Sequence, residues 1–158
     1  MKAVRAAVDR VLETILAALF AAMTIDLAWQ VATRFLLARP SPYTEELARF
    51  LVIWLGLLGA AYALGGRMHL AIELWQGTAA GRRWSRRASS AATLAFALGI
   101  LGAGGGSLVA LQVELGQRSP ALGLPMGWVY AALPIAGGLM AFYVAAEAVE
   151  RWRQAGGG

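Results

Sequence analysis

The sequence has no cysteine, a single histidine and few charged residues, which make up 15% of its 158 positions. The lack of cysteine excludes disulfides, thiolate zinc sites, iron–sulfur clusters and thiol redox catalysis. One histidine cannot supply a haem held by two imidazoles or a histidine-rich metal centre. We therefore expect no cofactor or metal ion in this chain and no enzymatic reaction.

Apolar residues, by contrast, make up 59% of the chain. Soluble domains are roughly 45–50% apolar and about 25% charged. A chain this short cannot hide the excess in a core, because small domains bury only about two-thirds of their surface. We therefore expect most of the surface to face lipid.

Four apolar runs reach the length needed to cross a bilayer, about 20 residues each. They cover residues 12–38, 47–64, 88–111 and 126–149. The connections between them are too short to build a second core, so we expect one domain over residues 1–158. The predicted fold class is an all-α membrane protein in which four transmembrane helices form a compact bundle.

The basic residues predict the orientation of this bundle, because cytoplasmic loops of membrane proteins carry an excess of Lys and Arg. Three lie in residues 1–10, five in 65–87, two after residue 150 and four elsewhere. Both termini are therefore expected in the cytoplasm. The net charge of +5 then reflects topology and attraction to phospholipid headgroups. Nothing in the sequence resembles a nucleic-acid-binding motif.

Two connections contain local signals. Ser41 and Pro42 predict a helix start, because they place an N-cap residue before a proline at the first helical position. Residues 70–84 are too short and too polar to span the membrane, and they combine Trp75 and Trp84 with a basic cluster. This composition predicts a short segment lying in the cytoplasmic interface between the second and third helices.

The first span contains a polar stripe, since Asp26, Gln30 and Arg34 follow one another at four-residue intervals on one helical face. An ionised carboxylate at the bilayer centre costs about 2.5–3.5 kcal/mol, so the stripe is not expected to face lipid. A proton or ion relay would need further buried carboxylates, which the other spans lack at this depth. The pattern favours a contact between helices or subunits over a relay.

The second span opens with Glu45, Glu46 and Arg49. Glu45 and Arg49 have the i, i+4 spacing of a surface ion pair. The alternative is a partner-facing cluster at the periplasmic rim, where Arg34 also ends the first span. Trp54 lies too deep for an interfacial belt, so we expect it to pack against protein or to stand among lipid tails.

Small residues in the later spans indicate close helix packing. Gly102 and Gly106 are four residues apart, which allows another helix to approach. They lie in an apolar span with no Lys-Ser or Lys-Thr after them, which argues against a phosphate-binding loop. Pro134, followed by Gly137 and Gly138, predicts a bend or a close-packing site.

A family resemblance rests on the stretch from Trp29 to Ile72. It reads WQVATRFLL, then PYTEELARFLVIWLGLLGAAYAL and then RMHLAI. This stretch resembles the DctQ-type small membrane subunit of tripartite ATP-independent periplasmic (TRAP) transporters. The matching positions are Arg34, Phe35, Thr44, Glu45, Glu46, Arg49, Trp54, Gly59, Ala60 and His69.

The resemblance implies a role in transport across the bacterial inner membrane. In such systems a periplasmic binding protein captures an organic acid and delivers it to two membrane subunits. The large subunit holds the substrate and sodium sites of this symport and moves in an elevator manner. The small subunit would scaffold the large one and contribute to docking of the binding protein.

Three sets of residues receive roles from the residues and the resemblance together. A polar seam and rim would contact other helices, the large subunit or the binding protein: Asp26, Gln30, Arg34, Glu45, Glu46 and Arg49. A second set would pack helices closely: Trp54, Gly59, Ala60, Gly102, Gly106 and Pro134. Two residues would anchor the cytoplasmic end of the second helix: Arg67 and His69.

Other functions remain open on the residues alone. A stand-alone small multidrug exporter also has four spans and a membrane carboxylate, but here Glu13 lies at the cytoplasmic start of the first span and the connection over 65–87 is long. A four-helix scaffold of another membrane complex would differ only in its partner. A redox anchor would need the cysteines or paired histidines that are missing. The transported substrate is not readable from a subunit that does not hold it.

Overall fold

The structure is a computed structural model that describes residues 2–36, 41–67 and 88–155. Residues 88–95 are α-helical and lead directly into the third long helix. The elements are α1 (Lys2–Leu36), α2 (Pro42–Arg67), the π-helix η1 (Phe96–Gly104), α4 (Gly105–Glu114), α5 (Met126–Tyr130) and α6 (Ala132–Ala155). The predicted interfacial segment 70–84 lies outside the described residues.

Four helical stretches are long and apolar enough to cross a membrane: Ala3–Phe35, Pro42–Gly66, Ala88–Glu114 and Met126–Trp152. Each contains most of one predicted apolar run, so the all-α architecture with four membrane-crossing helices is confirmed.

The first two helices extend beyond the apolar runs predicted from the sequence, since α1 begins at Lys2 and not at residue 12, and α2 begins before the run 47–64. Hydropathy marks only the apolar part of a helix, whereas the backbone stays helical into its polar ends. Pro42 is the first residue of α2, as the sequence predicts, and Thr44 Oγ1 donates to the Ser41 carbonyl oxygen over 2.9 Å.

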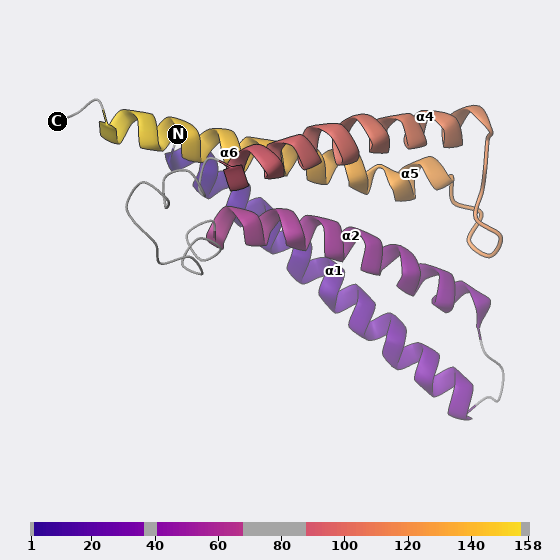
Figure 1. Cartoon of the computed structure of the whole chain (residues 1–158). Coiled ribbons are helices and arrows are strands. Elements are labelled where there is room, and N and C mark those ends of the chain that lie inside the picture. Colours follow the sequence, from indigo (N-terminus) through magenta and orange to yellow (C-terminus); the bar gives the residue numbers. More distant parts are fainter. Residues whose placement is uncertain (1, 37–40, 68–87, 156–158) are drawn as a thin grey trace.

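The helices form two pairs, α1 with α2 and the third helix with α6, and the two pairs meet where α2 packs on α6. α1 lies along α2, α2 packs on α6, and η1 with α4 packs on α6 and α5. The start of α1 and the end of α6 lie at one end of the molecule, and the connection over residues 115–125 lies at the other (Figure 1). Toward that second end the α1–α2 pair diverges from the pair formed by α4 and α5–α6 (Figure 1).

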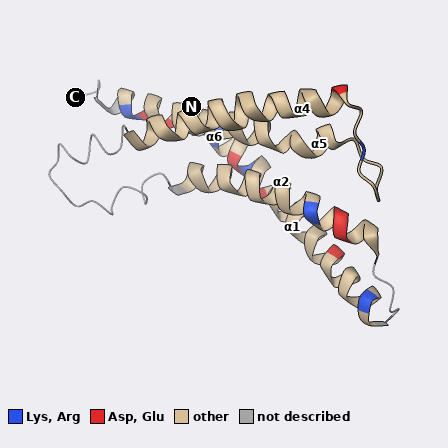
Figure 2. Cartoon of the chain, turned by 45° about the vertical axis from the view of Figure 1, so that its right-hand side comes forward, with Lys and Arg blue, Asp and Glu red and all other residues tan. Residues whose placement is uncertain are grey.

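α6 is the central helix. In its most apolar window 44% of the residues are buried, against 11–17% in the other three spans. Tyr143 on α6 is almost fully buried and joins Leu12 of α1 and Leu58 of α2 in one core cluster, against which Trp54 packs. Charged positions gather mainly toward the helix ends, and most of the ribbon between them carries uncharged residues (Figure 2).

The third helix approaches α6 closely at Gly105 and at the backbone of Gly102, whose nitrogen would stand 3.0 Å from a Cβ on Gly137, whereas Gly106 of the predicted pair faces open space. A Cβ on Gly105 would stand 2.7 Å from the Cβ of Leu133, whereas one on Gly106 would meet nothing within 4 Å. A Cβ on Gly102 would meet only a backbone oxygen of its own helix. The reason is η1: its i→i+5 pattern winds more residues into each turn than an α-helix does, which shifts the packing face.

The predicted packing pair Gly59 and Ala60 lies only partly on the face of α2 that packs inside the molecule. A Cβ on Gly59 would make an ordinary contact with Leu16 at 3.9 Å, and Ala60 is exposed. The face of α2 that packs inside the molecule has the spacing i, i+4, i+7, i+11 and consists of Trp54, Leu58, Ala61 and Gly65.

The predicted bend at Pro134 is present as a break between α5 and α6. Proline has no N–H to donate to the carbonyl of Tyr130, and its ring crowds that carbonyl. α5 therefore ends at Tyr130 and α6 begins at Ala132. Gly137 provides the close approach, because its Cβ would stand 2.6 Å from the carbonyl oxygen of Ala97, whereas Gly138 faces open space.

Candidate functional site

Hydrogen-bonded polar side chains gather in two layers, one near each end of the helices. The inner polar layer lies where α1 begins and α6 ends: Arg5, Asp9, Glu13, Tyr62, Tyr143 and Glu150. The outer polar layer lies where α2 begins: Glu45, Glu46, Arg49 and the connection 115–125. The basic-residue distribution assigns the inner layer to the cytoplasmic side.

The inner polar layer ties α1 to two other helices. Arg5 lies 3.5 Å from the Glu150 carboxylate of α6 and donates to the carbonyl oxygen of Gly65 in α2. Tyr143 donates to Asp9 over 2.5 Å. The guanidinium of Arg5 also lies 5.8 Å from the centre of the Tyr143 ring, within the range of a cation–π contact.

Glu13 completes this layer by accepting a hydrogen bond from the Tyr62 hydroxyl over 2.7 Å. Sequence reasoning missed the layer, because it treated Arg5 only as a topology signal and Glu13 only as a surface residue. The available signal was the four-residue spacing of Arg5, Asp9 and Glu13, which places all three along one side of α1.

Glu46 dominates the outer polar layer. Its Oε2 accepts two backbone hydrogen bonds, from Ala121 over 2.9 Å and from Leu122 over 2.8 Å. By contrast, Glu45 and Arg49 form an exposed ion pair at 3.5 Å. A pair this exposed contributes about 0–1 kcal/mol, so it holds little of the fold together.

The connection 115–125 is itself ordered by local hydrogen bonds. Gly116 and Gly123 have φ angles of +57° and +67°, in the left-handed region that favours glycine. The Ser119 N–H donates to the Leu124 carbonyl over 2.8 Å, and the Leu124 N–H donates to the Ser119 hydroxyl over 3.1 Å. Arg118 donates to the carbonyl oxygen of Gly123 over 3.0 Å.

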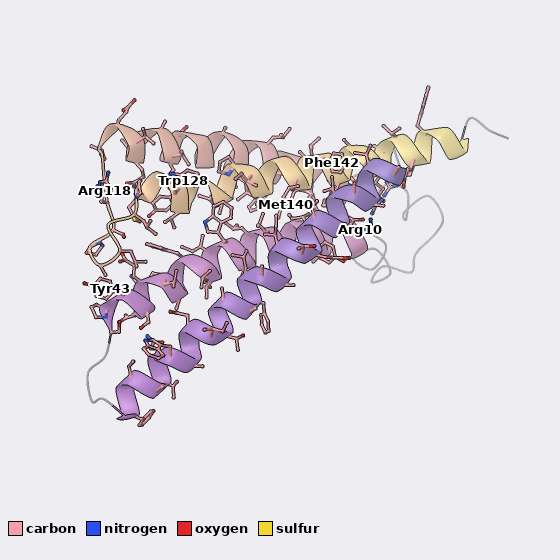
Figure 3. The ribbon with its side chains drawn as sticks, turned by 180° about the vertical axis from the view of Figure 1, so that it is seen from behind. Arg10, Tyr43, Arg118, Trp128, Met140 and Phe142 are labelled. Atoms are coloured by element: carbon pink, nitrogen blue, oxygen red, sulfur yellow. The ribbon has the colours of Figure 1, made fainter. Side chains whose placement is uncertain are left out.

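A cavity of about 390 Å³ lies between this connection and the start of α2. Both acidic and basic side chains line it together with apolar ones. Tyr43 and Arg118 lie at this end of the molecule (Figure 3). The lining residues are Pro42, Tyr43, Glu45, Glu46, Arg49, Pro120 and Ala121.

The three residues of the predicted polar stripe on α1 differ in burial. Asp26 and Thr33 are buried at 7% and 6% exposure, Gln30 is half-buried and Arg34 is exposed. At about 100° per residue, position 33 returns closer to the direction of Asp26 than position 34 does. The Asp26 Oδ2 atom has no hydrogen-bond partner among the described residues.

The predicted cytoplasmic anchor falls at the edge of what the structure describes. Arg67 is the last residue of α2. The prediction for His69 lies outside the described residues.

A larger groove has no polar lining. It has a volume of about 530 Å³ and lies between α1, α2 and α6. In the described part of the chain, no three His, Asp or Glu side chains gather closely enough to hold a metal ion. The groove is lined by Ala7, Val8, Val11, Leu12, Ile15, Trp54, Leu58, Ile135 and Leu139.

Four apolar helices with polar layers near both ends define a multi-pass membrane protein. The chain matches, over residues 23–154, the family described as the DctQ component of tripartite ATP-independent periplasmic transporters. It therefore belongs to this family.

Two curated relatives agree with the family. The chain is 29% identical over 147 residues to the sialic acid TRAP transporter small permease protein of Vibrio cholerae, covering 90% of this chain and 82% of the relative. It is 28% identical over 132 residues to a putative TRAP transporter small permease protein of Haemophilus influenzae, covering 82% and 80%.

The chain is thus a small permease subunit of a TRAP transporter in the bacterial inner membrane, and it is not an enzyme. Membership of the family implies association with a large TRAP membrane subunit and a periplasmic binding protein.

Proposed function

We propose that this subunit braces the large membrane subunit and helps to dock the binding protein during sodium-coupled uptake of organic acids, and that it carries no solute itself. The observation that supports this most directly is the placement of its polar groups. They tie helices and a connection to one another, while the groove of about 530 Å³ between α1, α2 and α6 is entirely apolar. An organic anion would find no polar path there.

The bracing surface is proposed to include the outer half of α1. α1 packs on α2, and the inner polar layer fixes the other end of α1 on α2 and α6. The remaining sides are apolar and suit phospholipid tails or the helices of the large subunit. Its exposed large apolar side chains are Phe20, Ile25, Leu27, Trp29, Val31 and Phe35.

Sodium and substrate sites are proposed to lie in the large subunit. A sodium site needs several oxygen ligands around one point, and the described residues of this chain offer no acidic cluster of that kind. The Vibrio cholerae relative is named for sialic acid, a carboxylic acid, which agrees with an organic acid as the cargo. No residue of the small subunit is assigned to substrate choice.

The test of the bracing role removes Arg34, whose side chain is exposed and therefore available to a partner. Arg34→Ala should reduce the amount of large subunit that co-purifies in detergent and should lower uptake in proteoliposomes. Arg10→Ala is the matched control, because Arg10 is an exposed arginine at the other end of α1. Asp26→Ala tests the buried part of the stripe in the same assay. If co-purification and uptake both stay at the wild-type level in these variants, the stripe has no role in assembly.

A further inference from the structure

We propose that Glu46 is a positioning residue, which fixes the connection 115–125 against α2 and thereby holds open a preformed docking surface for the binding protein. The inference rests on the proposed function and adds to it the residue that sets the shape of the docking surface. Three structural observations lead to it: the hydrogen bonding of the connection, the composition of the neighbouring cavity and the place of the connection outside the apolar spans.

The backbone of the connection leaves two adjacent donors for Glu46. The N–H groups of residues 119, 123 and 124 bond within the connection, and position 120 is a proline without an N–H. The N–H groups of Ala121 and Leu122 both donate to one oxygen of Glu46. Bonds from N–H groups to a carboxylate are roughly twice as strong as those between neutral groups.

Glu46 fixes the position of the connection and not its fold. The turn is closed by its own bonds and by Gly116 and Gly123 in the left-handed region. Among the described residues, the two bonds to Glu46 are the hydrogen bonds that join the connection to α2. Without them the connection would keep its local shape but could move as a unit relative to α2.

The cavity of about 390 Å³ depends on this position, because one wall belongs to α2 and the other to Pro120 and Ala121. Its lining includes Tyr43, which is 57% exposed, and Arg49, which is also exposed. Aromatic and arginine side chains around a preformed pocket are typical anchors of protein interfaces. A preformed surface also avoids the entropy cost of ordering a loop on binding.

The occupant is a water-soluble protein partner and not a lipid or a membrane helix. Residues 115–125 lie between the spans Ala88–Glu114 and Met126–Trp152, outside the apolar stretch of either. The cavity is lined by both signs of charge, from Glu45, Glu46 and Arg49. Charges of both signs at an open surface suit the polar rim of a protein interface and are unfavourable against lipid tails.

The experiment uses the complete transporter of both membrane subunits in proteoliposomes, with a sodium gradient and purified binding protein added in increasing amounts. Glu46→Ala should raise the half-saturating concentration of binding protein about tenfold, the size expected for losing hydrogen bonds to a charged group. The maximal uptake rate and the co-purified large subunit should remain near wild type. Amide hydrogen exchange of Ala121 and Leu122 should accelerate in the same variant.

Two further variants separate the possible causes. Glu114→Ala is the matched control, because Glu114 is an exposed glutamate at the end of α4, next to the connection, and does not line the cavity. It should leave the half-saturating concentration unchanged. Glu46→Gln retains an acceptor without the charge, so its shift should be smaller than that of Glu46→Ala. If Glu46→Ala does not assemble, the titration is carried out with Glu46→Gln. A half-saturating concentration equal to that of the wild type then overturns the inference.

The failures of the two proposals are distinguishable. If wild-type uptake saturates with binding protein but Glu46→Ala saturates at the same concentration, the inference about Glu46 is wrong and the proposed function stands. If Glu46→Ala lowers only the maximal rate and the co-purified large subunit, Glu46 acts on assembly and the inference is also wrong. If wild-type uptake does not depend on the binding protein, the proposed docking function is itself overturned.

Discussion

Tyr143 shows at the scale of one residue how a polar group is kept in this apolar chain. Its ring is 1% exposed in the core cluster and its hydroxyl donates to Asp9. Tyr143→Phe keeps the ring and removes the donor, which leaves the Asp9 carboxylate without that partner. We expect a loss of about 1–2 kcal/mol in the free energy of unfolding, measured in detergent.

Tyr62→Phe is the control for this prediction. The Tyr62 hydroxyl donates to Glu13 in an exposed position, where water can replace it. The loss should therefore be smaller than for Tyr143→Phe. Equal losses in the two variants would show that burial of the Tyr143–Asp9 pair adds nothing to its strength.

Residues of the inner polar layer could not be paired from the sequence. Tyr143 and Asp9 are separated by 134 positions, and Arg5 and Glu150 by 145. Their partnership depends on how α1 crosses α6, which spacing along one helix does not determine. Local features were accessible, because Pro42 as a helix start and Pro134 as a break each depend on a few neighbouring residues.

At the scale of an element, the π-helix η1 explains why Gly105, and not Gly106, packs closely against α6. Gly105→Ala places a methyl group 2.7 Å from the Cβ of Leu133, so the two helices must separate or distort. We expect a destabilisation of about 1–3 kcal/mol, the usual range for overpacking. Thermal unfolding of the purified subunit in detergent measures it.

Gly106→Ala provides the matched control one residue further along α4. A methyl group there meets nothing within 4 Å, and alanine is the better helix former. Its unfolding temperature should equal or exceed that of the wild type. If Gly106→Ala were the more damaging variant, the packing face would follow the α-helical spacing of the sequence and not the π-helix.

The π-helix also explains why the spacing of Gly102 and Gly106 did not predict the packing of Gly106 correctly. Gly102 and Gly106 have the spacing of a helix–helix contact only if every turn is α-helical. The C-terminal end of η1 shows the difference, since the Gly105 N–H donates to the carbonyls of Gly102 and Ile100, and Ile100 lies five residues back. α2 is α-helical throughout, so a π-helix does not explain its packing face. Ala60 is exposed there, whereas Ala61 and Gly65 face α6.

At the scale of the whole molecule, the four spans could be predicted because hydropathy and length report directly on the bilayer. The divergence of α1–α2 from α4–α6 could not be predicted, because apolar faces satisfy lipid and protein equally well (Figure 1). The resulting shape is fastened at the inner end by side chains of α1 and at the outer end by Glu46. It leaves long apolar faces for a larger membrane partner.

The central claim is that this subunit supports a transporter and transports nothing alone. The most direct measurement is uptake of labelled organic acid into proteoliposomes with a sodium gradient and the binding protein present. One preparation contains this subunit alone, a second the large subunit alone and a third both. We predict uptake above the empty-liposome level only where both subunits are present; uptake by this subunit alone would contradict the account.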